Sequence, residues 1–152
     1  MQTRRQALKS SAAVASLLAL TGLMPQIAHA AFNKTAFDAK NIADAMKALG
    51  SGAPVESKDV TIGGPDIAEN GAVVPFTLTT TLPGVKQLAL LVEKNPSALV
   101  ALFHMTDGVE ANFATRAKMG QSSDVYAVAI TNDGKAFFAK KEVKVTLGGC
   151  GG

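Results

Sequence analysis

Through the last two thirds of the chain, apolar and polar side chains alternate, and this pattern constrains the fold more than any other feature. Val74, Phe76 and Leu78 alternate with less apolar residues such as Thr77, and residues 109 to 114 repeat the alternation. A period of two places successive side chains on opposite faces of a strand. The pattern therefore predicts β-strands that each turn one face towards a core.

Turn dipeptides separate these runs. Asn70-Gly71, Asp107-Gly108 and Asp133-Gly134 are typical of tight hairpins because glycine adopts positive φ, and Pro83-Gly84 suits a type II turn. Seven strands are predicted, near 55–62, 72–80, 85–93, 98–105, 109–119, 123–131 and 136–147. Many short antiparallel strands at regular spacing predict an all-β fold, an immunoglobulin-like antiparallel β-sandwich without a second domain.

A single N-terminal helix is expected before the strands. Thr35 and Asp38 form a capping signal, apolar residues recur at helical spacing from Ile42 to Leu49, and Gly50 follows. These residues predict one amphipathic helix over 35–49.

Residues 1–30 have the features of an export signal. The apolar stretch 12–24 is too short for a membrane span, which needs roughly 20 residues. Ala28-His29-Ala30 resembles a cleavage site, with cleavage expected before Ala31. The basic start, 3–9, resembles the twin-arginine pattern except at Ala7, and an ordinary secretory signal remains the alternative. Either route predicts a periplasmic protein, and the twin-arginine route favours a partner acquired before export.

The charge balance depends on this signal. The whole chain has 15 basic and 12 acidic residues, but Arg4, Arg5 and Lys9 lie within residues 1–30. Residues 31–152 therefore have 12 of each and a formal net charge of zero. A neutral chain with few aromatic residues lacks the charge pattern of nucleic-acid-binding proteins. We expect neither a nucleic-acid nor a membrane partner.

The chain ends in Gly148-Gly149-Cys150-Gly151-Gly152, with its one cysteine among four glycines. Glycine has no Cβ and adopts both signs of φ, so this segment is expected to be a flexible arm beyond Leu147, the last anchored residue. Buried cysteine and a merely frayed terminus are the alternatives. Burial needs packing partners that glycines do not offer, and an unpaired thiol is a liability in an oxidising compartment. We therefore expect a displayed, functional thiol.

No residue near Cys150 is suited to activating it. The arm has no histidine, lysine or helix start that would lower the thiol pKa, so no catalytic residue is expected in this chain. One thiol without a second ligand also predicts no metal site. Two rivals to a passive attachment point remain. A thiol oxidoreductase would need a second cysteine, and a periplasmic adhesion or scaffold sandwich would use Cys150 only for an intermolecular disulfide.

The C-terminal sequence, residues 143–152, resembles the terminus of the SoxY family, the sulfur carriers of the periplasmic Sox thiosulfate-oxidising system. Segments 65–71, 92–96 and 115–119 are similar to segments of the same family in the same order. Leu147 departs from it, because a β-branched residue is frequent before the glycines.

The resemblance implies a carrier cycle and no enzymatic activity. Cys150 would be the covalent sulfur attachment, on a swinging arm made of Gly148, Gly149, Gly151 and Gly152. A c-type cytochrome (SoxAX) would conjugate thiosulfate to the cysteine, a hydrolase (SoxB) would release sulfate, and a dehydrogenase (SoxCD) would oxidise the remaining sulfur. SoxZ would be the tight partner. The only cofactors implied are covalent sulfur intermediates, and the chain would divide into signal (1–30), sandwich with helix (31–147) and arm (148–152).

The remaining residues that stand out in the sequence are expected to have structural roles. His104 is expected to cap a strand face, and the methionines are expected in the core. Lys140, Lys141 and Lys144 are interpreted as a solvated face, with steering of anionic sulfur species as the alternative. Arg116 and Lys118 are expected on the polar face of one strand, where they could meet a partner.

Overall fold

The computed structural model describes residues 32–147, which form two short helices and nine strands. The helices are α2 (Lys34–Phe37) and α3 (Ile42–Ala48). The strands are β1 (Val55–Glu56), β2 (Val60–Gly63), β3 (Ile67–Ala68), β4 (Val74–Thr80), β5 (Val85–Val92), β6 (Leu99–His104), β7 (Asn112–Ala117), β8 (Ser123–Thr131) and β9 (Ala136–Val145). The predicted signal (1–30) and arm (148–152) lie outside these residues.

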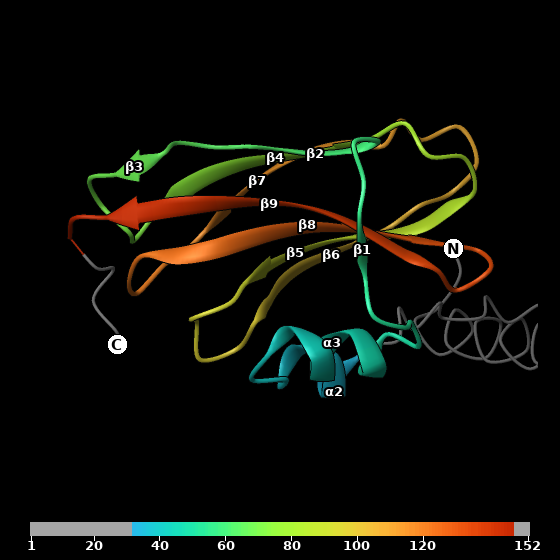
Figure 1. The fold of residues 1–152 in the computed structure, drawn as a ribbon, viewed down its shortest axis with the longest axis horizontal. Helices are drawn as coiled ribbons and strands as arrows, with labels where there is room; N and C mark the ends of the chain where they lie inside the picture. Colours follow the sequence, from blue (N-terminus) through green and yellow to red (C-terminus); the bar gives the residue numbers. More distant parts are fainter. Residues whose placement is uncertain (1–31, 148–152) are drawn as a thin grey trace, which may run out of the picture. The chain divides into compact units, whose positions relative to one another are not determined.

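The strands form two stacked sheets, as Figure 1 shows. The larger sheet has the order β1-β9-β8-β5-β6, with β3 pairing to β9, and the smaller sheet has the order β2-β4-β7. The pairings among strands β4 to β9 are all antiparallel. The two short strands β1 and β3 pair parallel to β9. The predicted all-β sandwich is confirmed.

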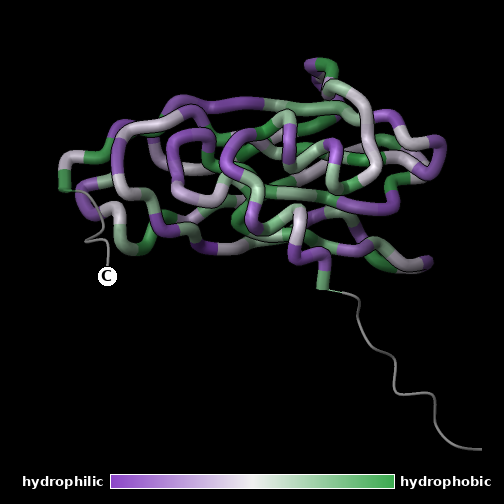
Figure 2. The backbone as a smooth tube through the Cα atoms, turned by 90° about the horizontal axis from the view of Figure 1, so that it is seen from below, coloured by the Kyte–Doolittle hydropathy of each residue, from purple (hydrophilic) through white to green (hydrophobic). Residues whose placement is uncertain are grey.

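The core between the sheets comes from the alternation read in the sequence. Val74, Phe76 and Leu78 of β4 are buried, whereas Pro75 and Thr77 are exposed. Figure 2 shows hydrophobic and hydrophilic residues following one another along the chain. Burial of these apolar faces is the main favourable contribution to folding.

Strands β5 and β8 are buried on both faces. Leu88, Leu90 and Val92 of β5 pack in the core between the sheets, whereas Ala89 and Leu91 pack in a second cluster beneath the helices. Figure 1 shows α2 and α3 lying over this outer face of the larger sheet. The helices thus protect the apolar residues that a two-layer sandwich would leave in water.

The single predicted helix over 35–49 is wrong, because Asn41 divides it into α2 and α3. Asn33 caps α2 by accepting a hydrogen bond from the Ala36 N–H. Asn41 has an extended backbone (φ −143°, ψ 166°) and caps α3 by accepting from the Asp44 N–H. An N-cap residue has non-helical φ and ψ, so Asn41 starts a new helix and cannot continue the first. The predicted stop at Gly50 is confirmed, with φ of 71°.

The turn predictions had mixed outcomes. Gly84, Gly108 and Gly134 have positive φ, and Asp133-Gly134 makes the expected β8–β9 hairpin. Asp107-Gly108 instead joins β6 of one sheet to β7 of the other, so it is not a hairpin. Asn70-Gly71 is not a hairpin either. Gly71 is buried, its N–H donates to the Leu147 carbonyl (2.8 Å) and its carbonyl accepts from the Met119 N–H (2.7 Å).

Candidate functional site

The predicted attachment residue Cys150 and the glycines Gly148, Gly149, Gly151 and Gly152 lie outside the described residues. The structure describes the strand that leads to them. Strand β9 runs to Val145, and Figure 1 shows its end beside β3. We call residues 66–71 and 143–147 together the arm base.

Backbone hydrogen bonds join the two segments of the arm base. Strand β3 pairs parallel to β9, with Ile67 opposite Lys144 and Ala68 opposite Val145. Three bonds run from Lys144 N–H to the Asp66 carbonyl (2.9 Å), from Thr146 N–H to the Ala68 carbonyl (3.1 Å) and from Gly71 N–H to the Leu147 carbonyl (2.8 Å). The chain is therefore held through Leu147, as the sequence predicted for this residue.

Side chains strengthen the arm base. The Ser122 hydroxyl accepts from the Val145 N–H (2.9 Å), and the Thr146 hydroxyl donates to the Glu69 carbonyl (3.0 Å). Val143 is completely buried in the core between the sheets. Detaching this end of β9 would expose the buried Val143 side chain and break these hydrogen bonds, so it would cost free energy.

Leu147 differs from the sequence expectation in its side chain. Alternation placed it on the same face as Val143 and Val145, but it is 70% exposed because regular pairing ends at Val145. Ile67 and Val73 of the neighbouring segment are also exposed, at 58% and 60%. Three large apolar side chains thus lie in water at this end of the sandwich. Alternation along β4 places Val73 on the face opposite the buried Val74, so its exposure follows from the pattern, whereas no sequence signal indicated the exposure of Ile67 and Leu147.

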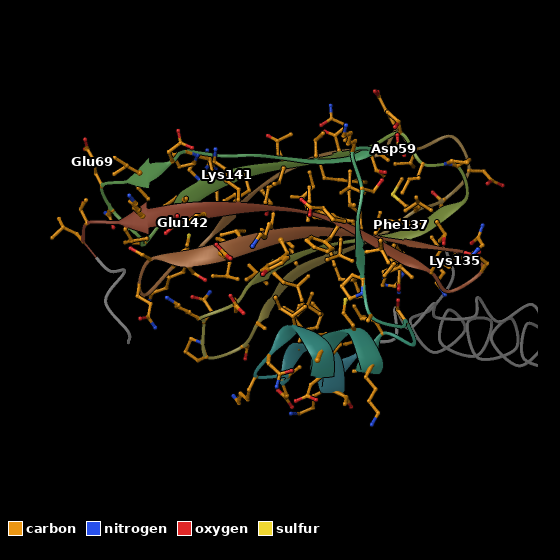
Figure 3. The ribbon with its side chains drawn as sticks, viewed as in Figure 1. Asp59, Glu69, Lys135, Phe137, Lys141 and Glu142 are labelled. Atoms are coloured by element: carbon orange, nitrogen blue, oxygen red, sulfur yellow. The ribbon has the colours of Figure 1, made fainter. Side chains whose placement is uncertain are left out.

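A salt bridge joins Asp66 of the arm base to Lys141, which lies further back on β9. The Lys141 Nζ lies 2.6 Å from Asp66 Oδ1, and Figure 3 shows Lys141 on β9 with Glu69 beyond it near β3. The hydrogen bond from Lys141, together with its charge, lowers the pKa of Asp66. Asp66 is exposed, so solvent screens the attraction between the two charges. The salt bridge therefore contributes more to the position of β3 than to the stability of the fold.

Replacing Lys141 with methionine should return the Asp66 pKa towards its ordinary value of 3.8. A lowered carboxyl pKa means that the pair contributes to stability above pH 3.8, and that this contribution is lost as the pH falls through the lower folded-state value. An NMR titration of the Asp66 carboxyl measures the change. Lys144→Met is the matched control, because Lys144 lies on the same strand without an ion pair among residues 32–147. An unchanged Asp66 pKa in Lys141→Met would contradict the assignment.

Lys140 of β9 also lies beside a carboxylate. Lys140 Nζ is 3.4 Å from Asp124 Oδ2, and the hydrogen bond to Asp124 raises the pKa of Lys140. Burial, with the charges of Glu93 and Asp124, raises the pKa of the neighbouring Tyr126. Positive and negative groups alternate here, which agrees with a solvated face. Steering of anions by Lys140, Lys141 and Lys144 stays a prediction.

The other residues considered from the sequence do not gather at the arm base. His104 is exposed at the end of β6, with its Nδ1 3.5 Å from Gln87 Nε2. Arg116 and Lys118 are both exposed and alternate with the buried Ala117 and Met119, which agrees with the predicted polar face, although β7 itself ends at Ala117. Met46 and Met119 are buried in the core, as expected, and Met105 is half-buried.

A cavity of about 450 Å³ was not predicted from the sequence. Strand ends and loops at the opposite end of the sandwich line it, including Thr80 of β4, Lys86 of β5, Asp107 and Asn132. Within residues 32–147, no three His, Cys, Asp or Glu side chains lie close enough together to hold a metal ion. No helix in this range is long and apolar enough to cross a membrane.

Comparisons with known proteins agree with the resemblance in the sequence. The family model for "Sulfur oxidation protein SoxY" matches residues 45–150. The structure of the sulfur carrier protein SoxY from Chlorobium limicola f thiosulfatophilum is similar, with 33% identity and a TM-score of 0.63 over 70% of this chain and 97% of that one.

A superoxide reductase (neelaredoxin) from Ignicoccus hospitalis shares only the fold, with 15% identity and a TM-score of 0.51 over 57% of this chain and 79% of that one. No curated protein sequence matches the chain. The family model covers more than half of the chain, and the SoxY structure is matched over nearly its whole length. The chain therefore belongs to the SoxY family of sulfur oxidation proteins.

Proposed function

We propose that this protein is a sulfur carrier. Cys150 covalently holds thiosulfate-derived intermediates, and Gly148, Gly149, Gly151 and Gly152 form the swinging arm that presents them to partner enzymes during thiosulfate oxidation. The observation that carries the proposal is the match to the SoxY family model, which extends to residue 150. The similar Chlorobium structure is itself of a sulfur carrier protein.

The arm base supports this role physically. The chain is hydrogen-bonded through Leu147, so movement of the thiol would begin with the glycines and not within the sandwich. Three extended residues span about 10 Å, which is enough to carry a thiol beyond the surface of the body. A short arm keeps a bound intermediate at high effective concentration for each enzyme.

The chemistry needs partners, because the sequence neighbours of Cys150 are glycines, which supply no base. A thiol and thiosulfate join through a new S–S bond with release of one proton and two electrons, which a c-type cytochrome of the SoxAX kind accepts. Water then cleaves the sulfur–sulfonate bond in a SoxB-type hydrolase, which releases sulfate and a proton and leaves a persulfide on Cys150. A SoxCD-type dehydrogenase oxidises the outer sulfur atom of the persulfide to a sulfonate, with three oxygen atoms taken from water and six electrons passed to the dehydrogenase. A second hydrolysis of the sulfur–sulfonate bond releases sulfate and restores the thiol. The protein is thus a substrate of these enzymes, with covalent sulfur in place of a cofactor.

Export and assembly follow from the same proposal. Residues 1–30 direct the protein to the periplasm by the twin-arginine route, residues 31–147 form the body and residues 148–152 the arm. SoxZ is the proposed tight partner, since a route for folded cargo permits export of an assembled pair.

Intact mass spectrometry of the protein from thiosulfate-grown cells tests the proposal. We expect part of the population to carry the mass of one S₂O₃ group or of added sulfur atoms, removable by dithiothreitol. Cys150 is the only cysteine in the sequence, so Cys150→Ser should carry none of these adducts. A population made only of unmodified thiol and reducible homodimer would reject the carrier and favour the scaffold alternative.

A further inference from the structure

The Asn70-Gly71 pair belongs to the arm base and does not form the hairpin that the sequence predicted. It is the only place in the sequence where glycine follows asparagine. Such a pair is chemically labile, because the backbone nitrogen of the second residue can attack the asparagine side chain, and glycine has no Cβ to obstruct the attack. Whether the pair reacts therefore depends on what holds that nitrogen.

The Gly71 nitrogen is held by a hydrogen bond across the arm base. Gly71 is buried, and its N–H donates to the Leu147 carbonyl (2.8 Å). On its other side, the Gly71 carbonyl accepts from the Met119 N–H (2.7 Å), so the peptide unit is fixed at both ends. The nitrogen attacks only after it has lost its proton. The bond to Leu147 retains that proton, and burial keeps solvent base away from it.

The Asn70 side chain is held as well, but in contact with water. Its Oδ1 accepts a hydrogen bond from the Ala72 N–H (2.8 Å), which forms an Asx turn. Asn70 is exposed, so water can reach its amide group. The folded chain therefore prevents the reaction by holding the backbone nitrogen, and not by excluding solvent from the side chain.

Detachment of the last two described residues releases this nitrogen. Strand β9 ends at Val145, so the bonds made by Thr146 and Leu147 lie past the end of the regular strand. Both residues are exposed. Segments at the margin of a fold open at a lower free-energy cost than its core strands. Opening of Thr146 and Leu147 therefore frees Gly71 while the sandwich stays folded.

We propose that Asn70 is a site of spontaneous deamidation that is gated by the arm base, so that it reacts only while Leu147 is detached. The Gly71 nitrogen loses its proton and forms a bond to Asn70 Cγ. The bond from Cγ to Nδ2 breaks, and the amide group leaves as ammonia after taking up a proton. Water then opens the resulting succinimide ring to give aspartate or isoaspartate. The reaction consumes water and needs no oxidant or enzyme.

The product hinders closure of the arm base. Isoaspartate places one additional methylene group in the backbone before Gly71, which displaces its N–H from the Leu147 carbonyl while β3 stays in register with β9. Either product adds a carboxylate next to Glu69, in a segment that already contains Asp66, and like charges repel. A copy that has reacted therefore closes less readily. The inference concerns the body and does not depend on sulfur chemistry.

Peptide mapping by mass spectrometry tests the inference on the purified chain, incubated at mildly alkaline pH. We expect Asn70 to deamidate roughly 100-fold more slowly in the folded protein than in the same protein unfolded in guanidinium chloride. Thr146→Val and Ser122→Ala each remove a side-chain hydrogen bond of the arm base, and each should accelerate the reaction of the folded protein roughly 5-fold. Asn70→Gln should give almost no product at this position, because the longer side chain closes a ring much more slowly.

Phe76→Ala is the matched control, because it weakens the core between the sheets and leaves the bonds of the arm base in place. If opening is confined to the arm base, this variant should deamidate within about twofold of the parent rate. Equal rates in the folded and unfolded protein would overturn the inference, and so would parental rates in both arm-base variants. A Phe76→Ala protein that reacts faster than either of them would also overturn it, since the route would then be unfolding of the whole sandwich.

Discussion

Replacing Cys150 with serine is expected to abolish sulfur loading and thiosulfate-dependent turnover by the partner enzymes. Serine keeps the size and polarity of the side chain but cannot form an S–S bond, so the first covalent step has no acceptor. Because Cys150 is the only cysteine, no second thiol can substitute for it. Turnover with thiosulfate by a reconstituted set of partner enzymes measures the effect, and we expect it to fall to the level seen without the carrier.

The body should not respond to this change. The residues of the arm base are held by backbone bonds and by the burial of Val143, none of which involves the thiol. The thermal unfolding midpoint of Cys150→Ser should therefore match that of the parent. A broad loss of stability would show that the thiol packs against the body, which would contradict the displayed arm.

A relocated thiol provides a sharper control. In the double variant Lys144→Cys/Cys150→Ser, the cysteine would lie on the exposed face of β9, where the backbone is fixed by the bond from its N–H to the Asp66 carbonyl. A thiol is then present but cannot leave the body. We expect reaction with small thiol reagents to persist and enzymatic turnover to stay absent. Recovery of turnover would mean that the position on the arm is unimportant.

The sandwich was predictable because its signal is local. Alternation over 74–79 decides which side chains of β4 face the core, and the structure buries the expected ones. Gly134 needs only its own positive φ to form the β8–β9 hairpin. Such features depend on neighbours in sequence, so one chain is enough to indicate them.

Some of the errors arose where a distant segment decides the outcome. Gly71 was expected in a hairpin, but it is buried because its N–H bonds to Leu147 and its carbonyl to Met119, residues far away in sequence. The two-residue strand β3 exists only because β9 supplies its hydrogen bonds. The break at Asn41 is a local signal that competed with an apolar helical pattern, and the cap was stronger.

The candidate site was predictable in composition but not in its surroundings. The lone cysteine among glycines is visible in the sequence. The chain is held through Leu147 as expected, but by the hydrogen bond to its carbonyl and not by the side chain that alternation had placed inward. The exposed side chains of Ile67 and Leu147 could not be foreseen, because apolar residues in strand-like runs are expected to be buried. Their exposure depends on where pairing stops, which the tertiary structure decides.

Replacing Phe76 with alanine is expected to lower the free energy of unfolding by about 3 to 5 kcal/mol. Phe76 is 2% exposed and lies at the centre of β4, in the core between the sheets. Its ring reaches the backbone of Gly64, where a Cβ would come within 2.8 Å of Cδ1. Removing the ring leaves a cavity that the paired strands on either side of β4 cannot easily close. Urea unfolding followed by circular dichroism measures the loss.

The exposed neighbour Thr77 supplies the control, and the pair tests how far the body and the arm are separate. Thr77→Ala should change the unfolding free energy by less than about 1 kcal/mol, because its side chain lies on the outer face of the smaller sheet. At a temperature where Phe76→Ala is still folded, its loading on Cys150 should equal that of the parent, since the arm base retains its hydrogen bonds. Reduced loading in a folded Phe76→Ala protein would mean that core packing reaches the arm, and that the sandwich does more than hold it.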